Sequence, residues 1–191
     1  MLKRSFDIMT SGLAVLLLSP LLLPIAIALL LTGEGEIIYR QERIGRYGRP
    51  FSILKFATML KNSPNLPGGD ITTGNDPRIL PVGGFLRRTK INELPQLLNI
   101  LKGDMSIVGP RPERQFFIDQ ITKIAPHYRH LHRVRPGLTS LGQVKYGYAE
   151  TVAQMVERLK FDILYIENMS LAMDFRVLLY TLKIIMEGRG K

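Results

Sequence analysis

Asn92-Glu93-Leu94-Pro95-Gln96-Leu97-Leu98-Asn99-Ile100-Leu101-Lys102-Gly103 is the most informative stretch of this sequence. Its leucines recur at i, i+3, i+4 and i+7, which predicts a helix with one apolar stripe. Because proline fits only the first turn of a helix, Pro95 places the helix start at or near Asn92, a preferred N-cap residue. Gly103 is typical of the residue that ends a helix.

This predicted helix start gathers groups that can bind phosphate. Glu93 would occupy the first helical position, against the positive end of the helix dipole, and free amides at a helix start bind anions. Arg87 and Arg88 lie just upstream. The sequence therefore predicts a carboxylate, exposed amides and guanidinium groups close together.

The composition narrows the class of protein. The 191-residue chain has the length of one domain and can bury a core, and it has no cysteine, which excludes disulfides and thiolate metal sites. Its formal net charge of +10 favours an anionic partner: nucleic acid, lipid head groups or phosphorylated substrates. The basic residues are spread along the chain without a recognisable nucleic-acid-binding module, so we expect no nucleic-acid partner.

Residues 13–31 are uncharged, apolar and numerous enough to span a membrane. A cleaved signal peptide is one interpretation, but Asp7 interrupts its basic region and the apolar run continues past Ala26-Ile27-Ala28, which imitates a cleavage site. A straight spanning helix is another interpretation. Basic residues on both flanks argue against it, because the positive-inside rule places all of them on the cytoplasmic side: Lys3, Arg4, Arg40, Arg43, Arg46 and Arg49.

A re-entrant helix, which enters and leaves the membrane on one side, satisfies both flanks. Pro20 lacks the amide that would bond to the Leu16 carbonyl, and Pro24 repeats the defect on the same face. Ser19 can offer its hydroxyl to a freed backbone group. We therefore predict a sharp kink at Ser19-Pro20, with a mildly kinked spanning helix as the alternative.

Local patterns predict several further elements. Residues 36–40 and 50–56 are expected to be strands of a hairpin around the turn at 45–48, and residues 62–77 a loop. Residues 151–169 form an amphipathic pattern with one apolar face: Val152, Met155, Val156, Leu159, Ile163 and Ile166. Residues 170–187 are apolar almost all round, so they form either a buried helix or a helix lying in the membrane interface.

Specific motifs run along nearly the whole chain. They are Tyr39-Arg40-Gln41-Glu42-Arg43-Ile44-Gly45, Leu54-Lys55-Phe56, Asn75-Asp76-Pro77-Arg78, the run FLRRTKINELPQLLNILKGDMSIVGPRPE at 85–113, Arg135-Pro136-Gly137-Leu138-Thr139, and Tyr165-Ile166-Glu167-Asn168-Met169-Ser170-Leu171. With these motifs the chain resembles the bacterial sugar transferase family, in its small monotopic phosphoglycosyl transferase form.

The resemblance implies a mostly helical α/β fold in a monotopic membrane protein. Residues 1–33 would form a re-entrant helix broken at Ser19-Pro20, and residues 34–191 a catalytic domain facing the cytoplasm on amphipathic interfacial helices. Family members use Mg²⁺ to transfer a sugar-1-phosphate from a UDP-sugar to undecaprenyl phosphate, and they release UMP. The product starts assembly of a capsule, exopolysaccharide, O-antigen or glycoprotein glycan at the bacterial inner membrane, so membrane phospholipids are further expected partners.

One position departs from the family at its catalytic Asp-Glu pair, whose Asp attacks the β-phosphate of the donor. Position 92 is Asn here, whereas Glu93 matches; Ala57 also replaces a usual Arg. An amide is a far poorer nucleophile than a carboxylate and a weaker Mg²⁺ ligand. Three explanations stay open: Glu93 takes the nucleophile's role, the phosphosugar passes directly to the lipid phosphate, or the chain is a catalytically silent relative that binds nucleotide-sugar or lipid phosphate.

The candidate site residues combine the motifs with charge. Glu93 is the main catalytic candidate, as a Mg²⁺ ligand or general base, and Asn92 marks the nucleophile's position. The candidate Mg²⁺ ligands are Glu93, Asn92 and Asp76. The candidate substrate-binding residues are Arg43, Lys55, Arg78, Arg88, Arg111, Glu113 and Arg135, of which Arg111, held between two prolines, best suits a diphosphate. Arg78 and Arg88 are equally suited to surface ion pairs with Asp76 or Glu93.

Other features carry weaker hypotheses. His127, His130 and His132 do not share one helical face, so we expect solvated surface positions rather than a metal site. Apolar helix faces could meet lipid or a second copy in a homodimer, so the oligomeric state is left open. The sugar and the glycan pathway stay open as well.

Overall fold

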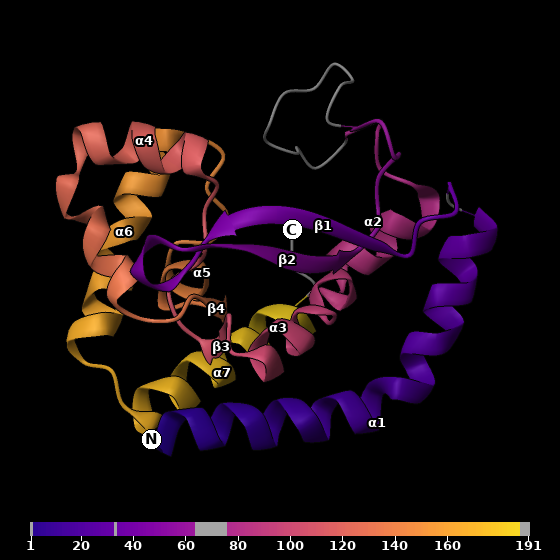
Figure 1. The fold of residues 1–191 in the computed structure, drawn as a ribbon, viewed down its shortest axis with the longest axis horizontal. Coiled ribbons are helices and arrows are strands. Elements are labelled where there is room, and N and C mark those ends of the chain that lie inside the picture. Colours follow the sequence, from indigo (N-terminus) through magenta and orange to yellow (C-terminus); the bar gives the residue numbers. More distant parts are fainter. Residues whose placement is uncertain (1, 33, 64–75, 188–191) are drawn as a thin grey trace.

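The chain forms a mostly helical α/β structure, as predicted (Figure 1). The computed structural model describes residues 2–32, 34–63 and 76–187. The short strands form two separate two-stranded sheets. In chain order the elements are α1 Leu2–Thr32, β1 Ile38–Ile44, the 3-10 helix η1 Arg46–Gly48, β2 Pro50–Phe56, α2 Pro81–Arg88, η3 Ile91–Glu93, α3 Gln96–Lys102, β3 Ser106–Val108, α4 Gln115–Ile124, η4 Pro126–Arg133, β4 Gly137–Thr139, α5 Leu141–Lys145, α6 Val152–Glu167 and α7 Leu171–Met186.

Helix α1 is long and apolar enough to cross a membrane, by length and composition alone, and no other helix of the described residues is. Pro20 and Pro24 lie inside it, and its axis turns part-way along its length (Figure 1). The Ser19 hydroxyl donates to the Leu16 carbonyl at 2.8 Å, the group that Pro20 leaves without an amide donor. The prediction that the Ser19 hydroxyl bonds to a freed backbone group is thus confirmed. The chain stays helical where the axis of α1 bends.

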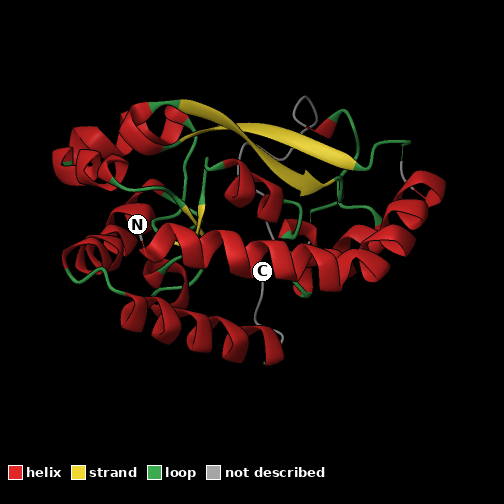
Figure 2. Cartoon of the chain, turned by 60° about the horizontal axis from the view of Figure 1, so that its bottom comes forward, coloured by secondary structure: helices red, strands yellow, loops and turns green. Residues whose placement is uncertain are grey.

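Helix α7 and the N-terminal part of α1 lie on the side of the molecule opposite the β1–β2 hairpin, whereas the end of α1 rises toward the hairpin (Figures 1 and 2). The Phe6 and Phe175 rings meet edge to face with centroids 5.3 Å apart, and Lys3 Nζ donates to Asp174. Within α7 only Asp174 and Val177 are buried, so the buried-helix interpretation of residues 170–187 is wrong. Both helices expose large apolar side chains, among them Leu13, Leu16, Leu17, Leu21 and Leu23 on α1, and Phe175, Leu179, Leu182 and Met186 on α7.

The predicted hairpin is confirmed, with β1 antiparallel to β2 and Tyr39 opposite Lys55. Strand β1 begins later than predicted and continues to Ile44, because the reversal is confined to η1, where Tyr47 and Gly48 take positive φ angles of 61° and 70°. The Asn99 amide on α3 accepts from the Leu54 amide at 3.0 Å and donates to the Ser52 carbonyl at 2.8 Å. These bonds fix the hairpin, and Lys55 with it, onto α3.

The helix over residues 92–103 starts differently from the prediction. Asn92 lies inside η3 and makes no capping hydrogen bond, while α3 itself begins after Pro95. Lys90 takes a left-handed φ of 61°, and the helical turn therefore starts before Asn92. The Glu93 amide donates to the Lys90 carbonyl at 3.0 Å, so it is not free for an anion. The N-cap prediction was therefore wrong, whereas the helix end at Gly103, with φ 102°, is confirmed.

Parallel strands β3 and β4 bring two glycines of separate motifs together. A Cβ on Gly137 would lie 2.1 Å from the Gly109 nitrogen, so both positions need the smallest side chain. The Gly137 amide donates to the Pro110 carbonyl at 2.9 Å, and the Gly109 amide donates to the Thr139 carbonyl at 3.0 Å. This contact holds the Pro110-Arg111-Pro112 segment against β4.

Three apolar clusters hold the elements together. One joins α4, η4 and α6 and contains the predicted apolar face of α6, with Met155 and Leu159 buried. A second joins α3, β3, α5, α6 and α7. A third, formed by Leu29, Phe56 and Leu86, ties the end of α1 to β2 and α2.

Candidate active site

A cavity of about 810 Å³ lies among the hairpin, η3, the segment after β3, and α6. The sequence-predicted residues that line it are Arg43, Lys55, Arg78, Asn92, Glu93, Arg111 and Glu113, and Arg87, Lys90 and Arg158 join them. Cations outnumber carboxylates in this set. The cavity therefore suits a ligand with several negative charges.

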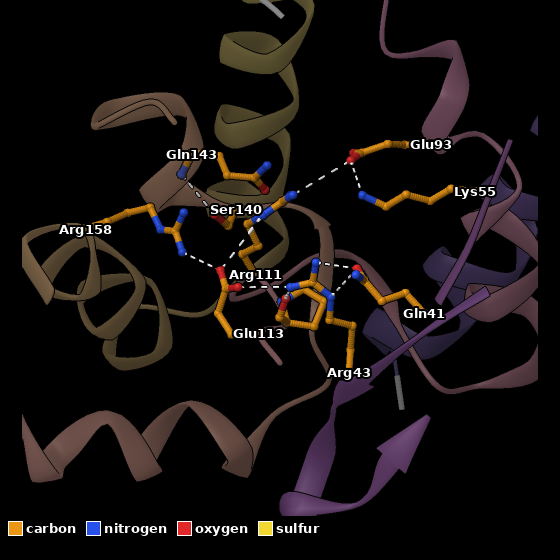
Figure 3. A network of polar contacts seen from close by, with 10 residues as sticks. Gln41, Arg43, Lys55, Glu93, Arg111, Glu113, Ser140, Gln143 and Arg158 are labelled. Atoms are coloured by element: carbon orange, nitrogen blue, oxygen red, sulfur yellow. Dashed lines mark hydrogen bonds and ion pairs between the residues drawn. The ribbon is translucent and has the colours of Figure 1, made fainter. Parts of the chain in front are cut away.

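Two carboxylates organise the cations (Figure 3). Glu93 Oε1 accepts from Lys55 Nζ at 2.9 Å and lies 3.9 Å from Arg111 Nη2. Glu113 accepts from Arg43 Nη1 at 3.0 Å and from Arg158 Nη2 at 2.7 Å. Arg111 Nε lies 4.0 Å from Glu113 Oε1, so the Arg111 guanidinium sits between the two carboxylates. The Ile44 amide donates to the Glu113 carbonyl at 3.0 Å and joins β1 to this segment.

Burial and charge shift the pKa values of these groups. Burial lowers the pKa of Lys55 to about 8, although the Glu93 charge opposes the shift. Burial by itself would raise the pKa of Glu93, but the charges of Lys55, Arg111 and Lys90 hold that pKa well below its ordinary value. Arg158, Arg43 and Arg111 likewise overcome burial and lower the pKa of Glu113. Both carboxylates are therefore ionised at neutral pH.

Asn92 is buried in the cavity lining with 8% of its surface exposed, and its Oδ1 has no hydrogen-bond partner. A buried acceptor without a donor is costly, so this oxygen is suited to a ligand. Amide and carboxylate oxygens are the ligands that Mg²⁺ takes, usually together with substrate phosphates and water. Asn92 and Glu93 fit such an ion, although the described residues contain no group of three or more His, Cys, Asp or Glu able to hold a metal.

Asp76 is not brought together with Asn92 and Glu93. Its Oδ1 accepts from Arg78 Nε at 2.8 Å and its Oδ2 from Arg78 Nη2, and these bonds lower the pKa of Asp76 to about 2. Both residues are buried, so the expected surface pair is instead a buried one. Arg78 lines the cavity and Asp76 does not.

Arg88 and Arg135 also lie apart from the cavity lining. Arg88 is exposed, whereas Arg87 lines the cavity because it follows the buried Gly83 by one helical turn of α2. Arg135 Nε donates to the Gly103 carbonyl at 2.8 Å, which satisfies the C-terminal end of α3. His127 and His130 are exposed on η4 and His132 is half-buried.

Sequence reasoning missed Arg158, Asp162 and Lys90. Arg158 and Asp162 stand four residues apart on α6, a spacing typical of an exposed ion pair, yet both are buried beneath α5 and the Glu113 segment. Burial raises the pKa of Asp162 to about 6. Only Lys90 had a signal in the sequence, because it continues the basic cluster of Arg87 and Arg88.

The fold and the cavity define a class: an α/β protein with a long apolar N-terminal helix and a cationic cavity built around two ionised carboxylates. The family model described as bacterial sugar transferase matches residues 1–188. The chain therefore belongs to the bacterial sugar transferase family, as its motifs indicate.

Relatives of known name cover this chain almost completely. It is 39% identical, over 99% of its length and 44% of the relative's, to a UDP-N-acetylgalactosamine-undecaprenyl-phosphate N-acetylgalactosaminephosphotransferase of Aeromonas hydrophila. It is 40% identical, over 95% of its length and 39% of the relative's, to a UDP-glucose:undecaprenyl-phosphate glucose-1-phosphate transferase of Escherichia coli strain K12. It is 37% identical to the exopolysaccharide production protein PSS of Rhizobium leguminosarum bv. phaseoli, over 99% of this chain and 98% of that protein. The chain thus spans less than half the length of the first two relatives and nearly all of the third.

Proposed function

We propose that this protein transfers a sugar-1-phosphate from a UDP-sugar to undecaprenyl phosphate, giving a polyprenyl-diphosphate-sugar and UMP. The network in which Arg111 lies between Glu93 and Glu113 carries the proposal, because it places a rigid guanidinium at the centre of a cationic cavity. The names of the Aeromonas and Escherichia relatives support both substrates.

The reaction exchanges one phosphoanhydride for another, so positioning and charge neutralisation supply most of the catalysis. An oxygen nucleophile attacks the β-phosphorus of the donor. The bond from that phosphorus to the oxygen bridging the two phosphates breaks, and UMP leaves with the oxygen and its electrons. Arg111, Lys55 and Arg87 are placed to neutralise the diphosphate, and Mg²⁺ held by Glu93, Asn92 Oδ1 and the phosphates would add further charge neutralisation.

Asn92 favours direct attack by the acceptor phosphate over a covalent enzyme intermediate. Glu93 is a weak base with an oxygen held by Lys55, which argues for a charge-stabilising role rather than for general-base or nucleophilic catalysis. A catalytically silent relative, which binds nucleotide-sugar or lipid phosphate without turnover, is the second candidate function, and the amide at position 92 is the observation that favours it.

We also propose that α1 is re-entrant and that the cavity faces the cytoplasm at the bacterial inner membrane. The basic residues on both flanks of α1, its bend, and the shared side of α1 and α7 support this placement. Residues 1–33 would then be the membrane segment and residues 34–191 the catalytic domain, acting at the first membrane step of glycan assembly. Membrane phospholipids would contact the exposed apolar side chains of both helices.

The test is UMP release by the protein in lipid nanodiscs with undecaprenyl phosphate, Mg²⁺ and a panel of UDP-sugars. We expect release that requires the lipid and one particular sugar, and mass spectrometry should find no phosphosugar adduct on the protein after exposure to the donor alone. Absence of release from both the unaltered protein and the Asn92→Asp variant would contradict the proposed activity.

Asn92→Asp is expected to raise UMP release by about 10²-fold or more, because it adds a carboxylate nucleophile beside Glu93. The same variant should acquire a donor-dependent phosphosugar adduct. Asn168→Asp, an identical change at an exposed residue after α6, is the matched control and should leave the rate unchanged. Turnover by Asn92→Asp with none from the unaltered protein would identify a silent relative.

A further inference from the structure

A second groove of about 500 Å³ lies between η3, α5 and α7. Its lining is chiefly apolar and includes Ile91, Leu94, Leu138, Val144, Leu178 and Ile185. The hydroxyls of Thr139 and Thr181, which also line it, lie 2.7 Å apart, and Thr181 donates to the Val177 carbonyl. These hydroxyls satisfy one another, whereas Gln143 in the lining has a buried Oε1 without a hydrogen-bond partner. Most of the wall is apolar and therefore suited to hydrocarbon.

The groove meets the cationic cavity at one end. Lys90, Glu93, Arg111, Tyr148 and Arg158 line both spaces. A ligand extending along the groove would therefore place its inner end beside the same Arg111 and Lys90 that face the cavity. This end carries net positive charge, which fits an anionic head group.

The other face of α7 points outward. Leu178 lines the groove, whereas Leu179 and Met186 are exposed on the same helix. The helix that walls the groove thus has apolar side chains on its outer face as well. The cationic inner end, the apolar groove and the exposed apolar side of α7 follow one another. A ligand with one anionic end and a long apolar tail matches this sequence of surfaces.

We propose that this groove holds the part of the acceptor's polyprenyl chain nearest its phosphate, and that it selects acceptors by their chain. The phosphate lies at the end formed by Lys90 and Arg111, within reach of a donor in the cavity, and the hydrocarbon runs between α5 and α7. The inference rests on the proposed function only in taking the acceptor to be a polyprenyl phosphate. Binding of the lipid does not require turnover.

Leu178→Phe fills the groove, and Leu179→Phe makes the same change at the next residue, which does not line the groove and is exposed on the outer face of α7. In the UMP assay we expect Leu178→Phe to raise the KM for undecaprenyl phosphate at least about tenfold and to leave the KM for the UDP-sugar within about twofold. Its preference for undecaprenyl over geranyl phosphate should shrink. Leu179→Phe should change none of these values. Equal effects of both variants on the lipid KM, or no effect of Leu178→Phe, would overturn the proposal.

Photo-crosslinking tests the groove without turnover and on the unaltered protein. An undecaprenyl phosphate with a diazirine close to its phosphate should label residues 138–148 or 178–185, and unlabelled undecaprenyl phosphate should compete while phosphatidylglycerol does not. Labelling confined to α1, or equal competition by the phospholipid, would overturn the proposal. Groove labelling by a protein that releases no UMP would support the groove and contradict only the transferase activity.

Discussion

Glu93 and Glu113 show how single residues set the chemistry of the cavity. Both are buried carboxylates, and a buried charge is tolerated only when it is paired and hydrogen-bonded. Lys55, Arg43 and Arg158 supply that pairing and leave Arg111 between the two carboxylates at longer distances of 3.9 and 4.0 Å. Among these four cations, Arg111 is therefore the one most available to a diphosphate.

UDP binding should weaken as Lys55 loses its proton. Since the pKa of Lys55 is lowered to about 8, its positive charge is present below that pH and lost above it. Calorimetry from pH 7 to 9.5 should show UDP affinity falling about three- to tenfold above pH 8.

The titration of Lys55 affects the stability of the protein in the opposite direction. Between pH 8 and the ordinary pKa of 10.5 the unfolded chain binds more protons, so the free energy of unfolding rises with pH.

Lys55→Arg is the control for this pH dependence, because guanidinium stays charged throughout the range. Its UDP affinity should be nearly independent of pH between 7 and 9.5. An Arg variant with the same alkaline loss as the unaltered protein would show that another group is responsible.

At the scale of elements, short segments from separate motifs meet by backbone contact. Asn99 of α3 bonds to the β2 backbone, and Gly109 after β3 packs against Gly137 of β4. These contacts help to bring Lys55 and Arg111 to the same oxygen of Glu93, Oε1. The sequence predicted the β1–β2 hairpin, but it predicted neither β3 nor β4 nor their pairing.

Gly137→Ala should destabilise the protein by about 1–3 kcal/mol, because its Cβ would meet the Gly109 backbone rather than a movable side chain. Thermal unfolding followed by circular dichroism measures the loss. Gly84→Ala inside α2 is the matched control, since no atom lies within 4 Å of its Cβ position. That change should stabilise the protein by about 0.5–1 kcal/mol. Equal melting temperatures for the two variants would contradict the close contact at Gly137.

The re-entrant placement of α1 predicts that both of its ends face the cytoplasm. The chain contains no cysteine, so single substitutions Ser5→Cys and Glu34→Cys give clean probes. In intact cells a membrane-impermeant thiol reagent should label neither, and both should react after the cells are opened. Labelling of one end in intact cells would show a spanning helix. Pro20→Ala with Pro24→Ala, which restores the helical amides, should favour that outcome.

At the scale of the whole molecule, polar contacts tie the apolar helices to the catalytic segment. Asp7 of α1 accepts from the Ser106 hydroxyl at 3.0 Å and from the Ile107 amide at 3.1 Å. The Tyr165 hydroxyl lies 2.6 Å from Asp174 Oδ1 and 3.1 Å from the Val108 carbonyl oxygen. Lys3 completes this network through Asp174. The position of α1 and α7 is thereby coupled to β3, which leads into Arg111.

Lys3→Met should cost about 1–3 kcal/mol of stability, because it leaves the buried Asp174 carboxylate without its cation. Adding Asp174→Asn to that variant should recover part of the loss, since the uncompensated charge is then gone. Urea unfolding of both single variants and the double variant measures this coupling. Strictly additive losses would show that the contact does not contribute to stability.

The sequence alone predicted the family and several of the elements, because helix periodicity, turn residues and long motifs are local signals. It did not predict α2, β3, α4, β4 or α5. It predicted the hairpin, the apolar face of α6 and the helix end at Gly103. It also proposed Glu93, Arg111, Lys55 and Glu113 as site residues, and the structure brings these four to one cavity. The loop predicted at residues 62–77 falls mostly outside the described residues.

Only the tertiary structure decided which charges are buried and which elements meet. In the structure Asp76 pairs with Arg78, and Arg87 rather than Arg88 lines the cavity. Arg158 is buried and bonded to Glu113, and Asp7 accepts a hydrogen bond from β3. These outcomes depend on the crossing of segments far apart in the chain. A side chain's burial and charge partners come from those long-range contacts, which local sequence periodicity does not encode.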